Sequence, residues 1–276
     1  MTQRQDIVSI VTVVYNGKHF IEKTINSVLS QTYPYIEYII IDGGSTDGTV
    51  DIIKKHEHKI SYWSSEPDKG VYDAMNKGIK KATGRWINFM NAGDYFFSPE
   101  TLQHFFCTDI NIDAYDAVYG DAEFRIKKIA YISPSGDKVD SNGFMPFSHQ
   151  AVFVKTDIAK ATLFDLRYRI TADTAFFLQL VQEGKIMCRI PVTVCSYDAL
   201  QGLSVQNEIK RTEELINMQV ALNGADRNNA YFRKQMRMAR IKQGIRKIIP
   251  SSIWIMLREH NAKKKGGYKI TGQSND

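Results

Sequence analysis

Runs of β-branched residues alternate with segments of helical periodicity over the first ninety residues of the chain. Residues 7–15 (IVSIVTVVY) and 35–42 (YIEYIIID) are rich in Ile and Val, which is typical of strands buried on both faces. The pattern predicts strands at 7–15, 35–42, 60–64 and 86–90, and helices at 19–31, 49–56 and 71–81. Strands that alternate with helices in this way favour parallel βαβ units with right-handed crossovers.

The pattern is weaker beyond residue 91. It predicts short strands at 117–119, 123–129 and 151–155, a helix at 173–183, and one or two strands across 186–197 around Pro191. With 276 residues, 43% of them hydrophobic, the chain is long enough for one sizeable α/β core with a short appendage. We therefore expect a domain over residues 1–223 with a mixed, mainly parallel sheet flanked by helices, followed by a helical extension over residues 224–276.

Positive charge is concentrated in that extension. Residues 227–276 contain 13 Lys and Arg against two acidic residues, a net charge of +11, whereas the rest of the chain is at −5. One helical face carries the apolar residues Met238, Ile241, Ile245 and Ile248. This combination is typical of a peripheral helix on anionic lipid, and the alternative is a helix that packs on the body and ends in a solvated tail. Nucleic-acid binding is disfavoured, because the charge is confined to the tail and no nucleic-acid motif is present.

The chain lacks the composition of a membrane span or a disulfide framework. No run approaches the roughly 18–20 apolar residues that a spanning helix needs, and the polar N-terminus leads into a strand pattern rather than a signal sequence. The three cysteines have no CxxC or metal-binding spacing, which favours a reducing compartment. We expect a cytoplasmic protein that associates with the inner face of the cytoplasmic membrane.

Polar, glycine-containing sequences follow three predicted strands: residues 15–17 (YNG), 42–49 (DGGSTDGT) and 91–94 (NAGD). Ligands of open parallel sheets bind at the carboxyl ends of the strands, and glycine lets the backbone approach a ligand closely. The alternative for residues 42–49 is a turn before a capped helix. Tyr15 and Asp94 likewise have structural alternatives, as a strand-end core aromatic and as a turn or cap residue.

Three ordered blocks together resemble the family 2 inverting glycosyltransferases with the GT-A fold: residues 10–16, IIIDGGSTDGT, and SEPDKGVYDAMNKGIKKATGRWINFMNAGD. The segments FSHQAVF, ADTAFFLQL and YDALQGLS extend the resemblance to Ser204, and they are most similar to bacterial members that build cell-surface polysaccharides. The resemblance implies a Rossmann-like GT-A sheet. It also implies a nucleotide-diphosphate donor, a UDP-sugar in particular, and a glycan or lipid-linked acceptor in O-antigen, capsule or exopolysaccharide synthesis.

The resemblance also implies a donor site. The family's nucleotide base lies against the first two strands, which places Tyr15 and Asp42 beside it, and Asp42 can accept a hydrogen bond from N3–H of a uracil. Asp68, in the loop before the third predicted helix, belongs to the same site. Lys69 and Arg85 are either donor contacts or solvated charges.

The family's acidic metal motif corresponds to Asn91–Asp94. Asn91 stands at its first position and Gly93 replaces the Asp expected to contact the ribose, so Asp94 is the acidic residue left to bind Mg²⁺ or Mn²⁺. One carboxylate is sufficient when substrate phosphates and water complete the coordination. Such an ion neutralises charge on the leaving diphosphate.

The family's general base, an acid at the start of a helix after the central sheet, corresponds to Asp173. Its alternative role is that of a first-turn acid that stabilises the helix. His149 is either a contact for the diphosphate or the acceptor, or a structural side chain. Asp121, which follows Gly120 after a predicted strand, is the next carboxylate available for acceptor contact.

We therefore predict an inverting glycosyltransferase. A sugar-nucleotide nucleotidyltransferase shares a similar sheet but needs a Gly-rich loop with a basic residue after the first strand, of which residues 15–18 are a poor version. A catalytically silent nucleotide-sugar-binding protein is the other alternative, and the presence of both Asp94 and Asp173 argues against it. A dinucleotide dehydrogenase is disfavoured because no GxGxxG follows the first strand.

Overall fold

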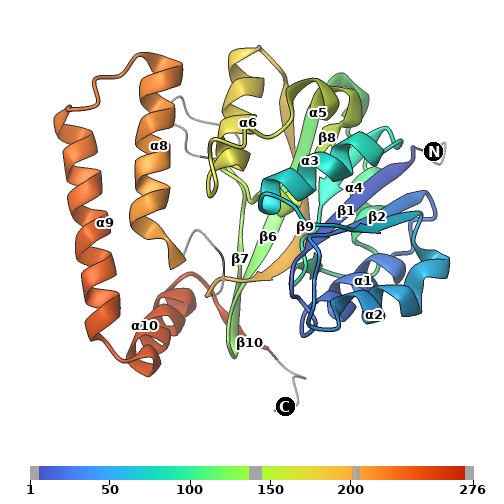
Figure 1. The fold of residues 1–276 in the computed structure, drawn as a ribbon, viewed down its shortest axis with the longest axis horizontal. Helices are drawn as coiled ribbons and strands as arrows, with labels where there is room; N and C mark the ends of the chain where they lie inside the picture. Colours follow the sequence, from blue (N-terminus) through green and yellow to red (C-terminus); the bar gives the residue numbers. More distant parts are fainter. Residues whose placement is uncertain (1–5, 137–144, 201, 203–205, 271–276) are drawn as a thin grey trace.

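The computed structural model describes residues 6–136, 145–200, 202 and 206–270. They form one mixed ten-stranded sheet with helices on both faces (Figure 1). The strand order is β10-β7-β6-β8-β4-β1-β2-β3, and β9 pairs with both β5 and β6.

The strands are β1 (Val8–Val14), β2 (Ile36–Asp42), β3 (Tyr62–Ser65), β4 (Trp86–Phe89), β5 (Tyr95–Phe96), β6 (Ala117–Ile126), β7 (Ile129–Ser133), β8 (Val152–Lys155), β9 (Met187–Asp198) and β10 (Tyr268–Lys269). The helices are α1 (Ile21–Leu29), α2 (Thr49–His56), α3 (Val71–Lys81), α4 (Thr101–Phe106), α5 (Thr156–Thr162), α6 (Ala172–Gln182), α8 (Glu208–Asn223), α9 (Ala230–Ile248) and α10 (Ser251–Lys264).

The parallel part of the sheet consists of β4, β1, β2 and β3. Val8 and Ile10 of β1 lie in a core shared with α1, α2 and α4, whereas Val11 and Val13 lie in a second core shared with α3, α5 and α6. Because helices cover both faces, both alternating sets of side chains are apolar, and the strand is a continuous hydrophobic run in the sequence. The predicted α/β architecture, with a mixed sheet flanked by helices, is confirmed.

The other part of the sheet is largely antiparallel and differs from the prediction. The predicted strand at 117–119 and residues 123–126 of the next one form a single strand, β6, and the chain turns at residues 127–128 into β7. Strand β9 continues through Pro191, and its parallel register with β6 shifts beside Gly120. A Cβ added at Gly120 would lie 2.3 Å from the carbonyl oxygen of Val192. Proline is tolerated in a strand at such an irregularity, because the regular ladder is interrupted there.

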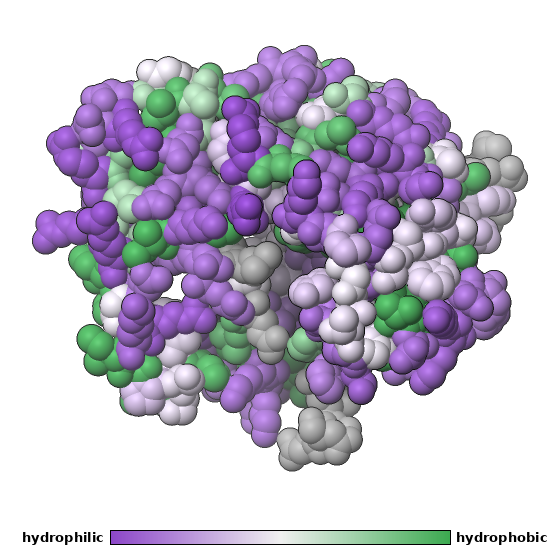
Figure 2. All heavy atoms as spheres, viewed as in Figure 1, coloured by the Kyte–Doolittle hydropathy of each residue, from purple (hydrophilic) through white to green (hydrophobic). Residues whose placement is uncertain are grey.

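The C-terminal segment returns to the sheet. Strand β10 pairs antiparallel with β7, and Ala262 of α10 is buried against Ile126 and Ile129. Helices α9 and α10 nevertheless leave large apolar side chains exposed among their basic residues, namely Tyr231, Met238, Ile241, Ile245, Ile248, Ile253, Met256 and Leu257. In Figure 2 green hydrophobic atoms accordingly lie beside purple hydrophilic ones on the side of the molecule formed by these helices. Within the described ranges, no helix is both long and apolar enough to cross a bilayer.

Candidate active site

The loops that follow β1 and β2 are joined to each other by hydrogen bonds. The N–H of Asn16 donates to Oγ of Ser45 (2.7 Å), and the N–H of Thr46 donates to Oδ1 of Asn16 (3.0 Å). The N–H of Gly17 donates to Oγ1 of Thr49, the first residue of α2 (2.9 Å). The two polar strand ends of the sequence therefore form one connected structure.

Asp42, at the end of β2, is fully buried and shapes this structure. Its Oδ2 accepts hydrogen bonds from the N–H of Gly44 (3.1 Å), the N–H of Ser45 (2.9 Å) and the hydroxyl of Ser65 (2.6 Å). Its Oδ1 accepts one from the hydroxyl of Ser45. The carboxylate thus has four donors from the protein itself, which gives it a role in holding the loop that sequence reasoning did not include.

Tyr15 and Asp68 meet over Gly43 on the open side of the same loop. A Cβ placed on Gly43 would lie 2.4 Å from Oδ2 of Asp68 and 3.4 Å from Cδ2 of Tyr15. The Tyr15 side chain is 65% exposed, and Asp68 Oδ1 accepts a hydrogen bond from the N–H of Gly70 (2.8 Å). These two residues, unlike Asp42, leave an aromatic face and a carboxylate oxygen available beside a glycine backbone.

The motif Asn91–Asp94 follows β4 and contains a buried amide oxygen, Oδ1 of Asn91, and a half-buried carboxylate, that of Asp94. Gly93 has φ +103°, a value that L side chains rarely adopt, so glycine suits this position for the backbone alone. Oδ2 of Asp94 accepts a hydrogen bond from Nε2 of Gln150 (3.0 Å). Oδ1 of Asn91 is buried and has no hydrogen-bond partner among the described residues.

Burial raises the pKa of Asp94 to about 6, against the opposing effects of the Gln150 hydrogen bond and the His149 charge. The Asp94 carboxyl therefore changes between its neutral and charged forms near pH 6 and is mainly charged at neutral pH. No group of three or more His, Cys, Asp or Glu side chains within the described residues is arranged to hold a metal by itself. The further ligands of a cation at Asp94 would be oxygens of other kinds, from amide groups, water or substrate phosphates.

Asp173 lies in the first turn of α6 and is connected to this motif through His149. Nδ1 of His149 is 3.3 Å from Oδ2 of Asp173, and Nε2 of His149 is 3.4 Å from Nδ2 of Asn91. On its other side, Oδ1 of Asp173 lies 3.2 Å from the hydroxyl of Tyr72 on α3. Both His149 and Asp173 remain partly open to solvent, at 23% and 24% exposure of their side chains.

The two members of this pair shift each other's titration. Burial alone would raise the pKa of Asp173, but the hydrogen bond and charge of His149 lower it, together with the Thr174 N–H and the Tyr72 hydroxyl. Burial alone would lower the pKa of His149, but the hydrogen bond and charge of Asp173 raise it. Asp173 is therefore ionised at neutral pH, which is the state that a general base requires.

The structure thus brings together Asn91, Asp94, His149 and Asp173, and adds Tyr72 and Gln150. Sequence reasoning missed these last two. Gln150 directly follows His149 in the segment FSHQAVF, and Tyr72 belongs to the segment SEPDKGVYDAMNK, so both lie within the motif blocks. Their roles depend on contacts between residues 56 and 101 positions apart, which no local pattern reveals.

Asp121 lies in a different environment. Its carboxylate accepts hydrogen bonds from Nη2 of Arg189 (3.0 Å) and from the N–H of Ser135 (2.8 Å). Both partners are outside the group around His149. Arg189 Nη2 also lies 3.0 Å from the second carboxylate oxygen, so both oxygens of Asp121 are occupied by contacts away from that group.

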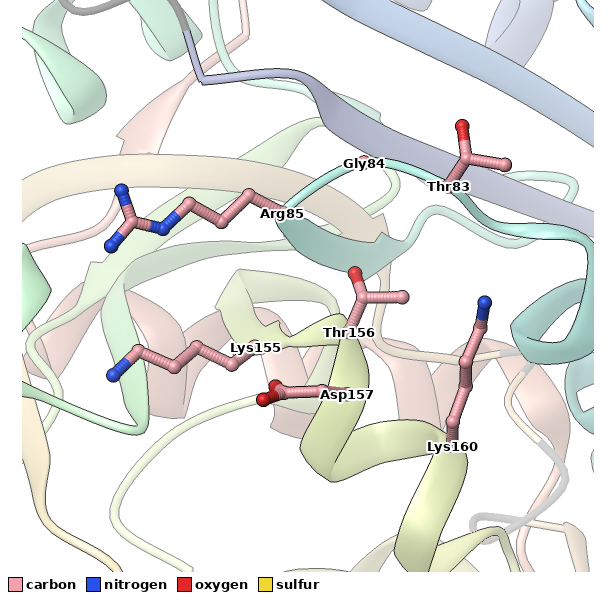
Figure 3. A pocket seen from close by; sticks show the side chains of 7 residues that line it. All are labelled: Thr83, Gly84, Arg85, Lys155, Thr156, Asp157 and Lys160. Carbon is pink, nitrogen blue, oxygen red and sulfur yellow. The ribbon is translucent and has the colours of Figure 1, made fainter.

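Arg85 lies away from the carboxyl ends of the parallel strands. It directly precedes β4, at the opposite end of that strand from Asn91, and Figure 3 shows it lining a cavity of about 480 Å³ with Lys155 and Lys160. The guanidinium pairs with Asp6 and Asp113. Of the two basic candidates, Arg85 is therefore not placed to contact a ligand at the carboxyl ends of the strands.

The sequence matches the model of the family described as Glycosyl transferase family 2 over residues 9–146. A PGL/p-HBAD biosynthesis glycosyltransferase of Mycobacterium bovis is 30% identical over 204 residues, which cover 71% of this chain and 78% of the relative. The putative teichuronic acid biosynthesis glycosyltransferase TuaG of Bacillus subtilis is 39% identical over 97 residues, or 34% of this chain and 38% of TuaG.

Solved structures share the fold at low sequence identity. The S. aureus TarS 1-349 complex with UDP-GlcNAc has a TM-score of 0.56 at 16% identity, over 83% of this chain and 70% of that one. In another TarS structure the match covers only 42% of the TarS chain. The mannosyltransferase PcManGT of Pyrobaculum calidifontis, in complex with GDP-Man and Mn²⁺, has a TM-score of 0.61 at 16% identity, over 86% of this chain and 70% of that one. These similarities confirm the predicted GT-A type of fold.

Proposed function

This chain is a family 2 glycosyltransferase, and from that premise we propose that it transfers a sugar from a nucleotide-diphosphate donor to a hydroxyl group with inversion at the anomeric carbon. The observation that carries the proposal is the ionised Asp173, paired with His149 beside the motif that contains Asp94. A single displacement needs one group to take the acceptor proton and a separate place for the leaving diphosphate, and we assign the first role to Asp173 and the second to the Asn91–Asp94 motif.

In the proposed reaction the acceptor hydroxyl oxygen attacks the anomeric carbon of the donor. The bond between that carbon and the diphosphate oxygen breaks, and the hydroxyl proton passes to Asp173. His149 and Tyr72 contact the carboxylate from two sides. Their contacts restrict its position before the acceptor binds, and prior positioning of this kind lowers the entropy cost of reaching the transition state.

The donor base is assigned to the loop held by Asp42. Tyr15 offers an exposed ring, and Asp68 offers an oxygen near the Gly43 backbone. We assign UDP as the nucleotide, which is supported by the UDP-GlcNAc bound to the structural neighbour TarS. Asp42 contributes to uracil recognition at least through the loop geometry that its four hydrogen bonds maintain.

Asn91 and Asp94 would hold the divalent ion. The buried, unpartnered Oδ1 of Asn91 and the carboxylate of Asp94 are oxygen ligands of the kind that Mg²⁺ and Mn²⁺ prefer, so these two described residues fit such an ion. When bound, the ion supplies charge neutralisation for the leaving diphosphate. The Mn²⁺ in the complex of PcManGT supports this assignment.

We assign the acceptor to a glycan or lipid-linked intermediate of bacterial surface polysaccharide synthesis. The roles of the two relatives, in PGL/p-HBAD and teichuronic acid biosynthesis, support this class. The exposed apolar side chains of α9 and α10, with Ile248 83% and Met256 60% exposed, support association with anionic membrane at the cytoplasmic face. The net charge of +11 over residues 227–276 favours the same surface.

Replacement of Asp173 by Asn tests the proposal. The amide keeps the size of the side chain and one acceptor oxygen but cannot take up the proton, so we expect kcat to fall by about 10²–10⁴-fold. The assay is UDP release from UDP-GlcNAc and other UDP-sugars with Mn²⁺, in which water serves as the acceptor. UDP affinity, measured by calorimetry, is expected to stay within about two-fold of the wild type.

Asp157→Asn is the matched control, because Asp157 is an exposed first-turn acid of a different helix, α5. A near wild-type rate in Asp173→Asn would remove Asp173 from the role of base. Release of pyrophosphate from UTP with a sugar phosphate would instead favour a nucleotidyltransferase. UDP-sugar binding with no turnover in the wild-type protein would favour a silent binding protein.

A further inference from the structure

Glu214 of α8 is a buried acid for which the proposed reaction has no direct use. The residue is only 8% exposed. Oε1 accepts a hydrogen bond from the N–H of Arg169 (3.0 Å), and Oε2 accepts one each from the N–H of Ile170 (2.8 Å), the N–H of Thr171 (3.0 Å) and the hydroxyl of Thr171 (3.1 Å). Burying a carboxylate is costly unless hydrogen bonds satisfy it, and here four donors from one short segment do so.

That segment leads directly into the helix that carries Asp173. Thr171 is the N-cap residue of α6, and Asp173 is in its first turn. The carbonyl oxygen of Ile170 lies 3.0 Å from the Tyr72 hydroxyl, and the same hydroxyl lies 3.2 Å from Oδ1 of Asp173. Glu214 therefore binds the N–H groups of residues 169–171. The carbonyl oxygen of Ile170 in the same segment contacts Tyr72, which in turn contacts the proposed base.

Packing between α8 and α6 orients the Glu214 side chain toward residues 169–171. Met218, one helical turn after Glu214, is fully buried against Ala175 and Leu178 of α6. Residues four apart lie on the same side of a helix, so one face of α8 presents both the carboxylate and the apolar contact. In Figure 1 the two helices lie next to each other at the top of the molecule.

We propose that Glu214 is a positioning residue for Asp173. It fixes the backbone of residues 169–171 so that the carboxylate of Asp173 is held where it meets the acceptor hydroxyl. This inference rests on the proposed role of Asp173 as general base. It also gives one residue of α8, a helix beyond the segment matched by the family model, a part in positioning the base.

Glu214→Gln tests the inference with little change of size. The amide has one acceptor oxygen instead of two and brings an NH₂ group that cannot accept from the backbone, so at least one N–H of the segment loses its partner. A displacement of about 1 Å at a catalytic group costs on the order of 10²-fold in rate. We expect kcat to fall by that order with UDP affinity unchanged. Glu213→Gln, at the neighbouring position, is the control and should leave kcat unchanged.

The double variant Asp173→Asn with Glu214→Gln separates positioning from a general structural role. If Glu214 acts through Asp173, its replacement slows the Asp173→Asn enzyme by less than about two-fold, because no base remains to be positioned. Equal slowing in the two backgrounds would overturn the inference, as would a lowered melting temperature with unchanged kcat.

If Glu214→Gln does not fold, Thr171→Val removes only the hydroxyl bond, and an unchanged kcat in that variant would also count against the inference. A near wild-type rate in Asp173→Asn refutes the base itself, which is a separate result from the failure of Glu214 alone.

Discussion

The substitution Gly43→Ala tests the proposed donor site without removing any functional group from it. Gly43 lies between Asp42 and the rest of the loop, and its φ is outside the left-handed region, so alanine introduces no backbone strain there. The added Cβ would lie 2.4 Å from Oδ2 and 3.1 Å from Cγ of Asp68. Ordinary contacts of a Cβ begin at 3.4 Å, so the Asp68 carboxylate would have to withdraw by about 1 Å.

Such a withdrawal moves the Asp68 carboxylate away from its place in the proposed site for the nucleotide base. Asp68 is held by the N–H of Gly70 at 2.8 Å, so the carboxylate moves only if that hydrogen bond is lost or the loop before α3 shifts. A hydrogen bond to a charged group contributes about 1.5–3 kcal/mol. Loss of one such contact to the donor therefore corresponds to a decrease in UDP affinity of about 10- to 150-fold.

Calorimetric titration with UDP and Mn²⁺ measures this decrease, and thermal unfolding shows whether the variant remains folded. The control is Gly244→Ala in α9, where an added Cβ has no atom within 4 Å. It should leave UDP affinity unchanged and, as a replacement of glycine inside a helix, should stabilise by about 0.5–1 kcal/mol. UDP affinity within about two-fold of the wild type in folded Gly43→Ala would show that Tyr15 and Asp68 do not form the base site.

Two further predictions concern the metal and the membrane. Because the pKa of Asp94 is raised to about 6, its carboxyl is neutral below that pH and charged above it, so protons compete with the metal and activity should fall as pH decreases through 6. Rate profiles over a hundred-fold range of Mn²⁺ should show this acid limb move to lower pH with more metal; a fixed limb, or full activity in EDTA, contradicts the assignment. The double substitution of Ile248 and Met256 by Glu should abolish co-sedimentation with anionic vesicles at an unchanged melting temperature, since both side chains are exposed. Sedimentation equal to that of the wild type would leave α9 and α10 without a membrane role.

Local sequence patterns were sufficient to predict the helices beside the parallel strands. Helices α2 and α3 span the predicted residues 49–56 and 71–81, because each has apolar positions at helical spacing and a glycine directly before it. The pairing of β6 with β9 was not predictable in the same way. It joins segments about 70 residues apart and includes an irregularity at Gly120 that only the approach of Val192 explains.

The residues of the candidate site likewise divide into those that local sequence patterns predict and those that only long-range packing explains. Tyr15, Asp42 and Asp94 each follow a buried strand, so the rule for parallel sheets is enough to place them at one edge from the order of residues alone. The contacts of Tyr72, Gln150 and Glu214 depend instead on how distant elements pack. Glu214 in particular belongs to α8, whose hydrophobic residues form a weak pattern, and its partners precede it by 43 to 45 positions.

The residues proposed for the donor and those proposed for the acceptor come from different parts of the chain. The loops proposed to bind the donor lie inside the segment matched by the family model, 9–146. The proposed base Asp173, its partner His149 and the Glu214 contact come from residues beyond that segment. If this division holds, changes in the packing of α6 and α8 alter acceptor recognition. The donor site on the parallel strands is then unchanged. On this reasoning, exchanging the region from 147 to 223 for that of a relative should alter the acceptor used and preserve the donor nucleotide, and a hybrid that changes its nucleotide instead would show that the two halves are not separable.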